Sequence, residues 1–214
     1  MRILIVSPFK SAEFNRRFSG QPDAALGGQR KIESLIRAML AAGNEVAVVS
    51  SAVGAANDWR IQTIPIHDQS FPEGRISVRH APAIHVKMLG GLLISVLAPI
   101  QALFEARRFI PDLLFLYNGL APEALSAMTV RLGSRCPTVL EIDDLPSVRR
   151  SRWHPKSLLD AFCWPLALRT ADGFVLVNSQ IVSEEVVGGH PSILLPGIVD
   201  EGLLALASKR RATF

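Results

Sequence analysis

The chain has 214 residues, of which 49% are hydrophobic and 20% are charged, so it fits one large or two small globular domains and not a disordered protein. Lysine and arginine outnumber aspartate and glutamate by 23 to 19, and this excess is spread along the chain, so we expect no nucleic-acid partner. Cys136 and Cys163 fit neither a disulfide framework nor a metal-ligand motif. We therefore expect a cytoplasmic protein with no metal and no other cofactor.

The first part of the chain alternates between strand and helix patterns. Residues 2–8 form an apolar run typical of a strand buried on both faces, and residues 45–50 form a second one. Between them, apolar residues of 32–40 recur at helical spacing, and Gly43 supplies a stop signal. These segments predict a βαβ unit with parallel strands. Residues 51–75 contain several proline and glycine residues, and we interpret them as a surface excursion within one domain rather than as a domain boundary.

The alternation continues to the end of the chain. Further strands are predicted over 76–84, 112–117, 137–142, 174–178 and 192–195, with helices over 86–109, 121–132, 157–170 and 180–187 between them. Pro99 is expected to interrupt the long helix. Such a series predicts an α/β fold with a doubly wound parallel sheet. We assign residues 1–200 to this Rossmann-like domain and 201–214 to a linker or tail.

Residues 88–104 carry no charged side chain, and Arg107 and Arg108 follow them. The run contains Pro99 and two glycines, and it is shorter than the roughly twenty apolar residues that a membrane span needs. We expect this segment to attach the protein reversibly to the inner surface of an anionic membrane. A helix buried in the protein core is the alternative.

In sheets of this kind, ligands bind at the carboxyl ends of the strands. Gly27 and Gly28 open the first long helix, where free backbone N–H groups and the positive end of the helix dipole favour a phosphate group. A turn that needs a positive φ angle is the alternative. The glycine fingerprint of dinucleotide-binding domains, the phosphate loop of nucleotide hydrolases and the zinc helix of metalloproteases are all missing from the sequence, which disfavours those classes.

A second candidate loop contains Glu141, Asp143 and Asp144 at the end of a strand. Carboxylates this close repel one another unless a helix N-terminus, a metal or a polyhydroxylated ligand such as a sugar offsets their charge. In the alternative, Asp144 caps a turn and Glu141 pairs with an arginine such as Arg149.

Asn118 and Ser179 follow two other strands at the same edge of the sheet. They are smaller candidates for ligand contacts, and turn chemistry explains them equally well.

Several motifs, in their order and spacing, resemble one protein family. They occupy residues 2–8, 27–28, 42–46, 111–115, 138–146, 171–179 and 195–200. Together they are similar to the N-terminal, acceptor-side domain of family-four retaining glycosyltransferases, which have the GT-B fold. Two departures are a missing histidine at Asp143, where many members have one, and Pro196-Gly197 in place of the usual Pro-Asn.

The resemblance implies different roles for the candidate residues. Gly27 and Gly28 would approach the diphosphate of a nucleotide-sugar donor, while Asn118 and Ser179 would contact the acceptor. The carboxylates of the 141–144 loop would lie where the acceptor hydroxyl meets the sugar, and one of them should orient that hydroxyl.

Members of this family continue into a second Rossmann-like domain that binds most of the donor. We therefore expect a C-terminal donor domain or a separate donor subunit as partner, and no transfer by this chain alone. The expected reaction moves a sugar from a nucleotide-sugar donor to a hydroxyl of a lipid-linked or polysaccharide acceptor. The alternative is a non-catalytic nucleotide- or sugar-binding module that recruits a separate donor-binding subunit.

Overall fold

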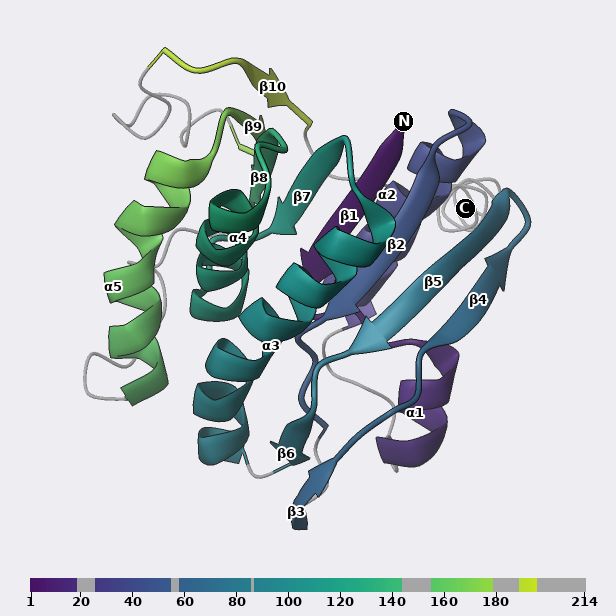
Figure 1. The fold of residues 1–214 in the computed structure, drawn as a ribbon, viewed down its shortest axis with the longest axis vertical. Coiled ribbons are helices and arrows are strands. Elements are labelled where there is room, and N and C mark those ends of the chain that lie inside the picture. The colour runs from purple at the N-terminus through teal and green to yellow at the C-terminus, as the bar shows by residue number, and fades with distance from the viewer. Residues whose placement is uncertain (19–25, 55–57, 86, 144–154, 179–188, 196–214) are drawn as a thin grey trace, which may run out of the picture.

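The computed structural model describes residues 1–18, 26–54, 58–85, 87–143, 155–178 and 189–195, and within them strands alternate with helices (Figure 1). The strands are β1 (Arg2–Ser7), β2 (Glu45–Ser50), β3 (Asp58–Gln62), β4 (His67–Phe71), β5 (Gly74–His80), β6 (Ala83–His85), β7 (Leu113–Tyr117), β8 (Thr138–Ile142), β9 (Gly173–Leu176) and β10 (Ser192–Leu194). The helices are α1 (Ala12–Phe18), α2 (Leu26–Ala41), α3 (Lys87–Phe109), α4 (Ala121–Gly133) and α5 (Pro155–Thr170).

The main sheet has eight strands in the order β10-β9-β8-β7-β1-β2-β5-β4. Neighbouring strands are parallel throughout, except that β4 pairs antiparallel with β5 at one edge. A second, two-stranded sheet joins β3 and β6 in antiparallel orientation. The predicted α/β class and the mostly parallel, doubly wound sheet are confirmed.

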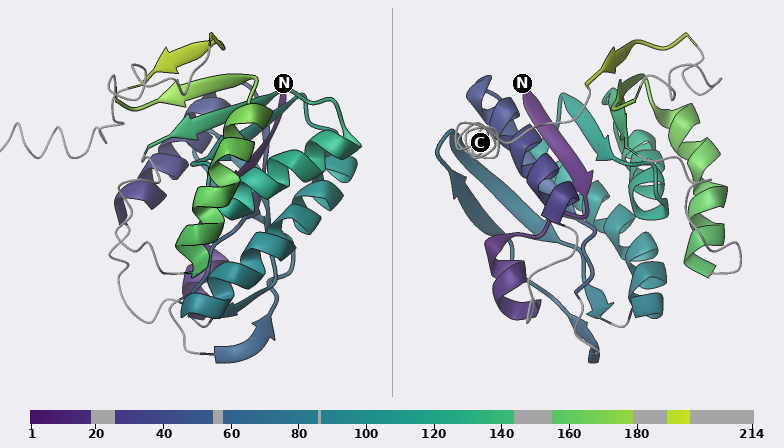
Figure 2. Two further views of the ribbon diagram at one scale, coloured as in Figure 1. Left: turned by 90° about the vertical axis from the view of Figure 1, so that its left-hand side faces the viewer. Right: turned by 180° about the vertical axis from the view of Figure 1, so that it is seen from behind.

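Helices cover both faces of the main sheet (Figure 2). Alternate residues of β1 point to opposite faces, as the pleat of a strand requires. Ile3 and Ile5 join the core beneath α2, whereas Leu4 and Val6 join the core beneath α3, α4 and α5. This double burial explains why the central strands are continuous apolar runs in the sequence.

Some predicted elements differ from the structure. Residues 51–75 contain the strands β3 and β4, and the predicted strand 76–84 consists of β5 and β6. Helix α1 was not predicted from the sequence. Helix α3 continues through Pro99, which is buried, because the tertiary contacts of α3 with α4 and the sheet outweigh the local cost of proline. The predicted helix over 180–187 and the tail over 201–214 lie outside the described residues.

Candidate functional site

The sheet has a topological switch point between β1 and β7. From β1 the chain first builds β2 and β5 on one side, and then β7, β8 and β9 on the other. Crevices outside the carboxyl ends of strands at such a point are the usual ligand sites of open α/β sheets. In Figure 1 these ends point downward, toward α1 and β6.

Four neighbouring strands carry polar residues side by side, at or next to their last position. The strand register pairs Ser7 with Ser50 and Tyr117 with Glu141, and the pairing of the preceding residues places Ser7 next to Tyr117. Residues in register on parallel strands share a face of the sheet. Tyr117 belongs to the core beneath α2, so this polar row lies under α2.

Lys31 of α2 connects the row to the carboxylate loop. Its ammonium forms an ion pair with Glu141, with Nζ 2.5 Å from Oε1, and a second ion pair with Oδ1 of Asp143. The hydroxyl of Tyr117 donates a hydrogen bond to Oδ2 of Asp143 at 2.5 Å. The positive charge of Lys31 thus reduces the repulsion between Glu141 and Asp143 that the sequence predicts.

The two carboxylates differ in their exposure. The side chain of Glu141 is 0% exposed, whereas that of Asp143 is 18% exposed. Oε1 of Glu141 is held by its ion pair with the ammonium of Lys31, whereas Oε2 is buried without a hydrogen-bond partner among the described residues. The buried hydroxyl of Ser7 also has no partner there.

Burial raises the pKa of Glu141 to about 7; Asp143 adds to this rise, while the hydrogen-bonding and charge effects of Lys31 oppose it. The loss of hydration therefore outweighs the attraction of the ammonium. Near neutral pH, Glu141 changes between a neutral and an ionised state.

Gly28 lies next to this cluster, at the start of α2. A Cβ atom at this position would be 3.5 Å from the Tyr117 hydroxyl, an ordinary van der Waals distance. The first turn of α2 contains no acidic residue, so no side chain of that turn neutralises the positive end of the helix dipole. Gly27 also belongs to α2. The helix start is thus electrostatically suited to an anion.

Asn118 joins the ends of β7 and β8. Its backbone has a φ angle of 60°, in the left-handed region that asparagine tolerates better than most residues. Its N–H donates to the carbonyl of Glu141 at 2.9 Å, and its side-chain Oδ1 accepts from the N–H of Asp143 at 3.0 Å. Asn118 therefore fixes the backbone that carries both carboxylates.

The structure brings together four of the residues singled out from the sequence: Gly28, Asn118, Glu141 and Asp143. Asp144 and Ser179 lie outside the described residues, as does Arg149, the alternative partner of Glu141.

Lys31 and Tyr117 were missed by the sequence analysis. Lys31 lies one helical turn after Gly27, and Tyr117 is the only tyrosine of the chain and ends a buried strand. A buried phenol needs a hydrogen-bond partner, and that signal could have indicated Tyr117.

A second polar cluster lies on the opposite face of the sheet. Ser51 donates to Oε1 of Glu123 at 2.6 Å, and burial raises the pKa of Glu123 to about 7. Nearby, Lys156 pairs with Asp160, which also accepts a hydrogen bond from the N–H of Ala121 at the start of α4. This cluster connects β2, α4 and α5. Within the described part of the chain, no group of three or more His, Cys, Asp or Glu side chains is placed to hold a metal.

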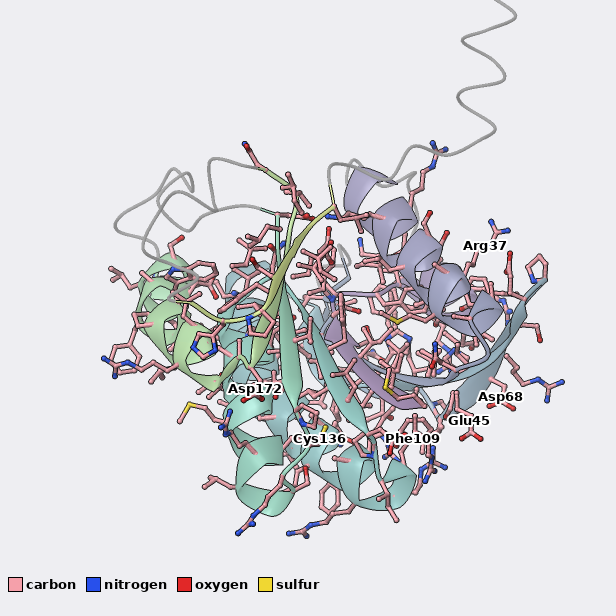
Figure 3. All side chains as sticks on the ribbon, turned by 90° about the horizontal axis from the view of Figure 1, so that it is seen from above. Arg37, Glu45, Asp68, Phe109, Cys136 and Asp172 are labelled. Atoms are coloured by element: carbon pink, nitrogen blue, oxygen red, sulfur yellow. The ribbon has the colours of Figure 1, made fainter. Side chains whose placement is uncertain are left out.

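A cavity of about 420 Å³ lies at the opposite end of the strands, around the amino ends of β8 and β9. It is lined by Arg131, Arg135, Cys136, Pro137 and Asp172. Figure 3 shows Cys136 and Asp172 on this side of the molecule. The cavity is therefore separate from the polar row at the carboxyl ends.

The chain matches a family model and several solved structures. The family model, described as "Glycosyl transferase 4-like domain", matches residues 27–187, which is more than half of the chain. No curated protein sequence matches.

Sucrose-phosphate synthase from Thermosynechococcus elongatus is similar with a TM-score of 0.66 and 14% identity, over 95% of this chain and 49% of that one. UDP-GlcNAc 2-epimerase from Neisseria meningitidis, bound to UDP-GlcNAc, is similar with a TM-score of 0.53 and 11% identity, over 100% of this chain and 51% of that one. The complex of S. aureus MnaA with UDP gives a TM-score of 0.53 and 11% identity, over 94% and 48%. The chain spans about half the length of these structures.

At such low identity, the solved structures establish the fold, and the family model establishes the family. The likeness to sucrose-phosphate synthase extends over almost the entire chain, in agreement with the resemblance found in the sequence. The chain belongs to the glycosyl transferase 4-like domain family and has the fold of the N-terminal domain of GT-B glycosyltransferases.

Proposed function

We propose that this chain is the acceptor-side part of a retaining glycosyltransferase. The reaction moves a sugar from a nucleotide-sugar donor to a hydroxyl of a lipid-linked or polysaccharide acceptor. One observation carries the proposal: Gly28, at the start of α2, lies beside the cluster of Lys31, Tyr117 and Asp143 at the switch point of the sheet. A site for an anion and a site for hydroxyl groups are thus adjacent.

The donor diphosphate binds at the start of α2 in this proposal. Free N–H groups at a helix start bind phosphate oxygens, and the missing side chain of Gly28 leaves room for their approach. The Lys31 ammonium has three N–H donors and lies against two carboxylates, so one donor is left for a phosphate oxygen. Two of the similar structures contain UDP or UDP-GlcNAc, which supports a ligand of this class.

Asp143 is the residue that contacts the acceptor. It is partly exposed, and each of its oxygens keeps a lone pair after bonding to Lys31 and Tyr117. The acceptor hydroxyl donates to this carboxylate and is held toward the anomeric carbon. Glu141, which is fully buried, is a positioning residue that acts through Lys31.

The transfer step needs no further base from these residues. The bond between the anomeric carbon and the diphosphate oxygen breaks, and the acceptor oxygen bonds to that carbon on the same face. The acceptor proton passes to an oxygen of the departing diphosphate. Asp143 orients the hydroxyl, and the start of α2 stabilises the charge on the leaving group.

A second domain or a separate subunit completes the donor site in our proposal. We propose that the partner binds most of the nucleotide and that this chain supplies the contacts to the diphosphate and the acceptor.

Gly28 tests the donor site. We compare Gly28→Ala with Gly28→Val in the full-length protein, by calorimetric titration with UDP and a panel of UDP- and GDP-sugars. The Cβ of alanine has room beside Tyr117, whereas the branched side chain of valine reaches into the space for the phosphate. We expect near-native affinity for alanine and about tenfold or weaker binding for valine. Equal affinities for the two variants would contradict the donor site.

Asp143 tests the acceptor site in a transfer assay. Asp143→Asn should lower kcat/KM for the acceptor roughly ten- to a hundredfold, which corresponds to about 1.4 to 2.7 kcal/mol of transition-state stabilisation. Donor affinity should change little. Full activity of this variant over a range of acceptor concentrations would contradict the assignment. Donor binding without any transfer by the full-length protein would favour the non-catalytic module.

A further inference from the structure

The layer formed by α3, α4 and α5 has an asymmetric distribution of charge. Each acidic side chain on these helices is buried, namely Glu105, Glu123 and Asp160. The exposed charged side chains described for the layer are all arginines, and they lie in the last turns of the helices: Arg107, Arg108, Arg131 and Arg169. The helix dipole favours cations in the last turn, but it does not account for the lack of exposed carboxylates.

Four arginines elsewhere on the described surface pair with carboxylates that are at least partly exposed. The pairs are Arg2 with Glu45, Arg17 with Glu13, Arg37 with Glu73, and Arg75 with Asp68. On the helical layer the acidic partners are instead buried or come from outside the layer, as in the pair of Arg131 with Asp172. The outer face of the layer is therefore cationic.

The same layer exposes large apolar side chains. Val96, Ile100 and Phe104 follow one another at intervals of four residues along α3, and Phe104 is 55% exposed. Leu158 and Phe162 have the same spacing on α5, and Phe162 is 73% exposed. The described residues of α2, on the opposite face, include no exposed large apolar side chain. A helix that only faces water would have a polar outer side, as α2 has.

Helix α3 is packed along its inner side. One segment, Leu89–Phe109, is long and apolar enough to cross a membrane by length and composition, but half of it is buried inside the molecule. Ala98, Ala102 and Ala106 are buried, and the last two belong to the core that α3 shares with α4. Crossing a bilayer would remove these contacts, whereas contact along the outer side would keep them.

We propose that the outer face of α3, α4 and α5 docks on an anionic membrane, with the helices lying along the bilayer surface. Phe104 and Phe162 enter the boundary between headgroups and acyl chains, and the four arginines contact lipid phosphates. An anionic bilayer matches this face, because its charged headgroups and its apolar interior extend over a wide area. Helix α3 alone extends over about 34 Å at 1.5 Å per residue. The proposal does not depend on the proposed transfer reaction.

Vesicle flotation of the full-length protein tests the proposal. One set of vesicles contains phosphatidylcholine only, and the other also contains about one-third phosphatidylglycerol. The first double variant combines Arg107→Gln with Arg169→Gln, and the second combines Phe104→Gln with Phe162→Gln. A control double variant combines Arg75→Gln with Ile193→Gln, two exposed sites outside the layer. Circular dichroism verifies that each variant is folded.

We expect binding to the anionic vesicles only, and weaker binding at high salt. The arginine variant should bind roughly twenty- to thirtyfold more weakly, from about fivefold for each arginine. The phenylalanine variant should bind at least about tenfold more weakly, and the control should bind as the wild type does. Equal binding to both vesicle types, no binding to either, or an unchanged arginine variant would each overturn the proposal. So would a layer variant that changes the sedimenting mass in the absence of lipid, because the face would then join copies of the protein.

Discussion

Replacing Glu141 by glutamine should change how the stability of the protein depends on pH. Glu141 is fully buried, and its pKa is raised from its ordinary value of 4.5 to about 7. Between these two pH values the folded chain keeps a proton on Glu141 that the unfolded chain has lost. The free energy of unfolding therefore falls as pH rises through this window and levels off above about pH 7.

The size of this effect follows from the width of the window. A rise in pKa from 4.5 to about 7 corresponds to about 3 kcal/mol at 1.36 kcal/mol per pKa unit. Glutamine has nearly the same shape but does not ionise. The Glu141→Gln variant should therefore be about as stable as the wild type near pH 4.5, and more stable by about 3 kcal/mol at pH 8.

Urea unfolding at several pH values between 4.5 and 8 measures this difference directly. Glu123→Gln is a matched variant, because burial also raises the pKa of Glu123 to about 7 on the opposite face of the sheet. The two effects should add in the double variant, since the sites share no partner. A constant stability difference between Glu141→Gln and the wild type across the pH range would refute the reasoning.

Three other predictions follow from the same structure. Lys31→Met should extend the fall in stability above pH 7, as measured by the same urea titration, because Lys31 lowers the pKa of Glu141 and its loss lets that pKa rise further. Gly90→Ala should destabilise the fold by more than about 3 kcal/mol in thermal unfolding, since its Cβ would lie 2.2 Å from a backbone carbonyl oxygen. Gly91→Ala is the control, because the nearest atoms to its Cβ belong to the flexible side chain of a lysine. Residues 1–214 alone should give no sugar transfer in a radiolabelled-donor assay, and turnover by this chain without a partner would contradict a donor site completed by a partner.

Strands buried on both faces were the most predictable part of the fold. Residues 45–50, for example, were predicted with the bounds that β2 has in the structure. The strand β4, with the sequence His-Asp-Gln-Ser-Phe, escaped prediction because an edge strand carries polar residues and shows no apolar run. Helix α1 has one buried side chain, Phe14, so it has too little apolar periodicity to be recognised.

The candidate site was predictable only where it follows from local sequence. Asn118 and Asp143 come directly after strands, and the rule that ligands bind at strand ends was enough to select them. The role of Lys31 depends on a contact with Asp143 across 112 positions of the chain. Such a contact is set by how α2 packs on the sheet, and no local pattern reveals it.

Asn118 also affects how readily the site can respond to a ligand. Its two hydrogen bonds join the end of β7 to the backbone of Glu141 and Asp143, so these two strand ends are held together. The conformational entropy of this corner is thus lost during folding and not during binding. A ligand or a closing partner meets a preorganised surface, and a larger share of its contact energy is retained as affinity. Binding would then need little rearrangement of the corner formed by Asn118, Glu141 and Asp143.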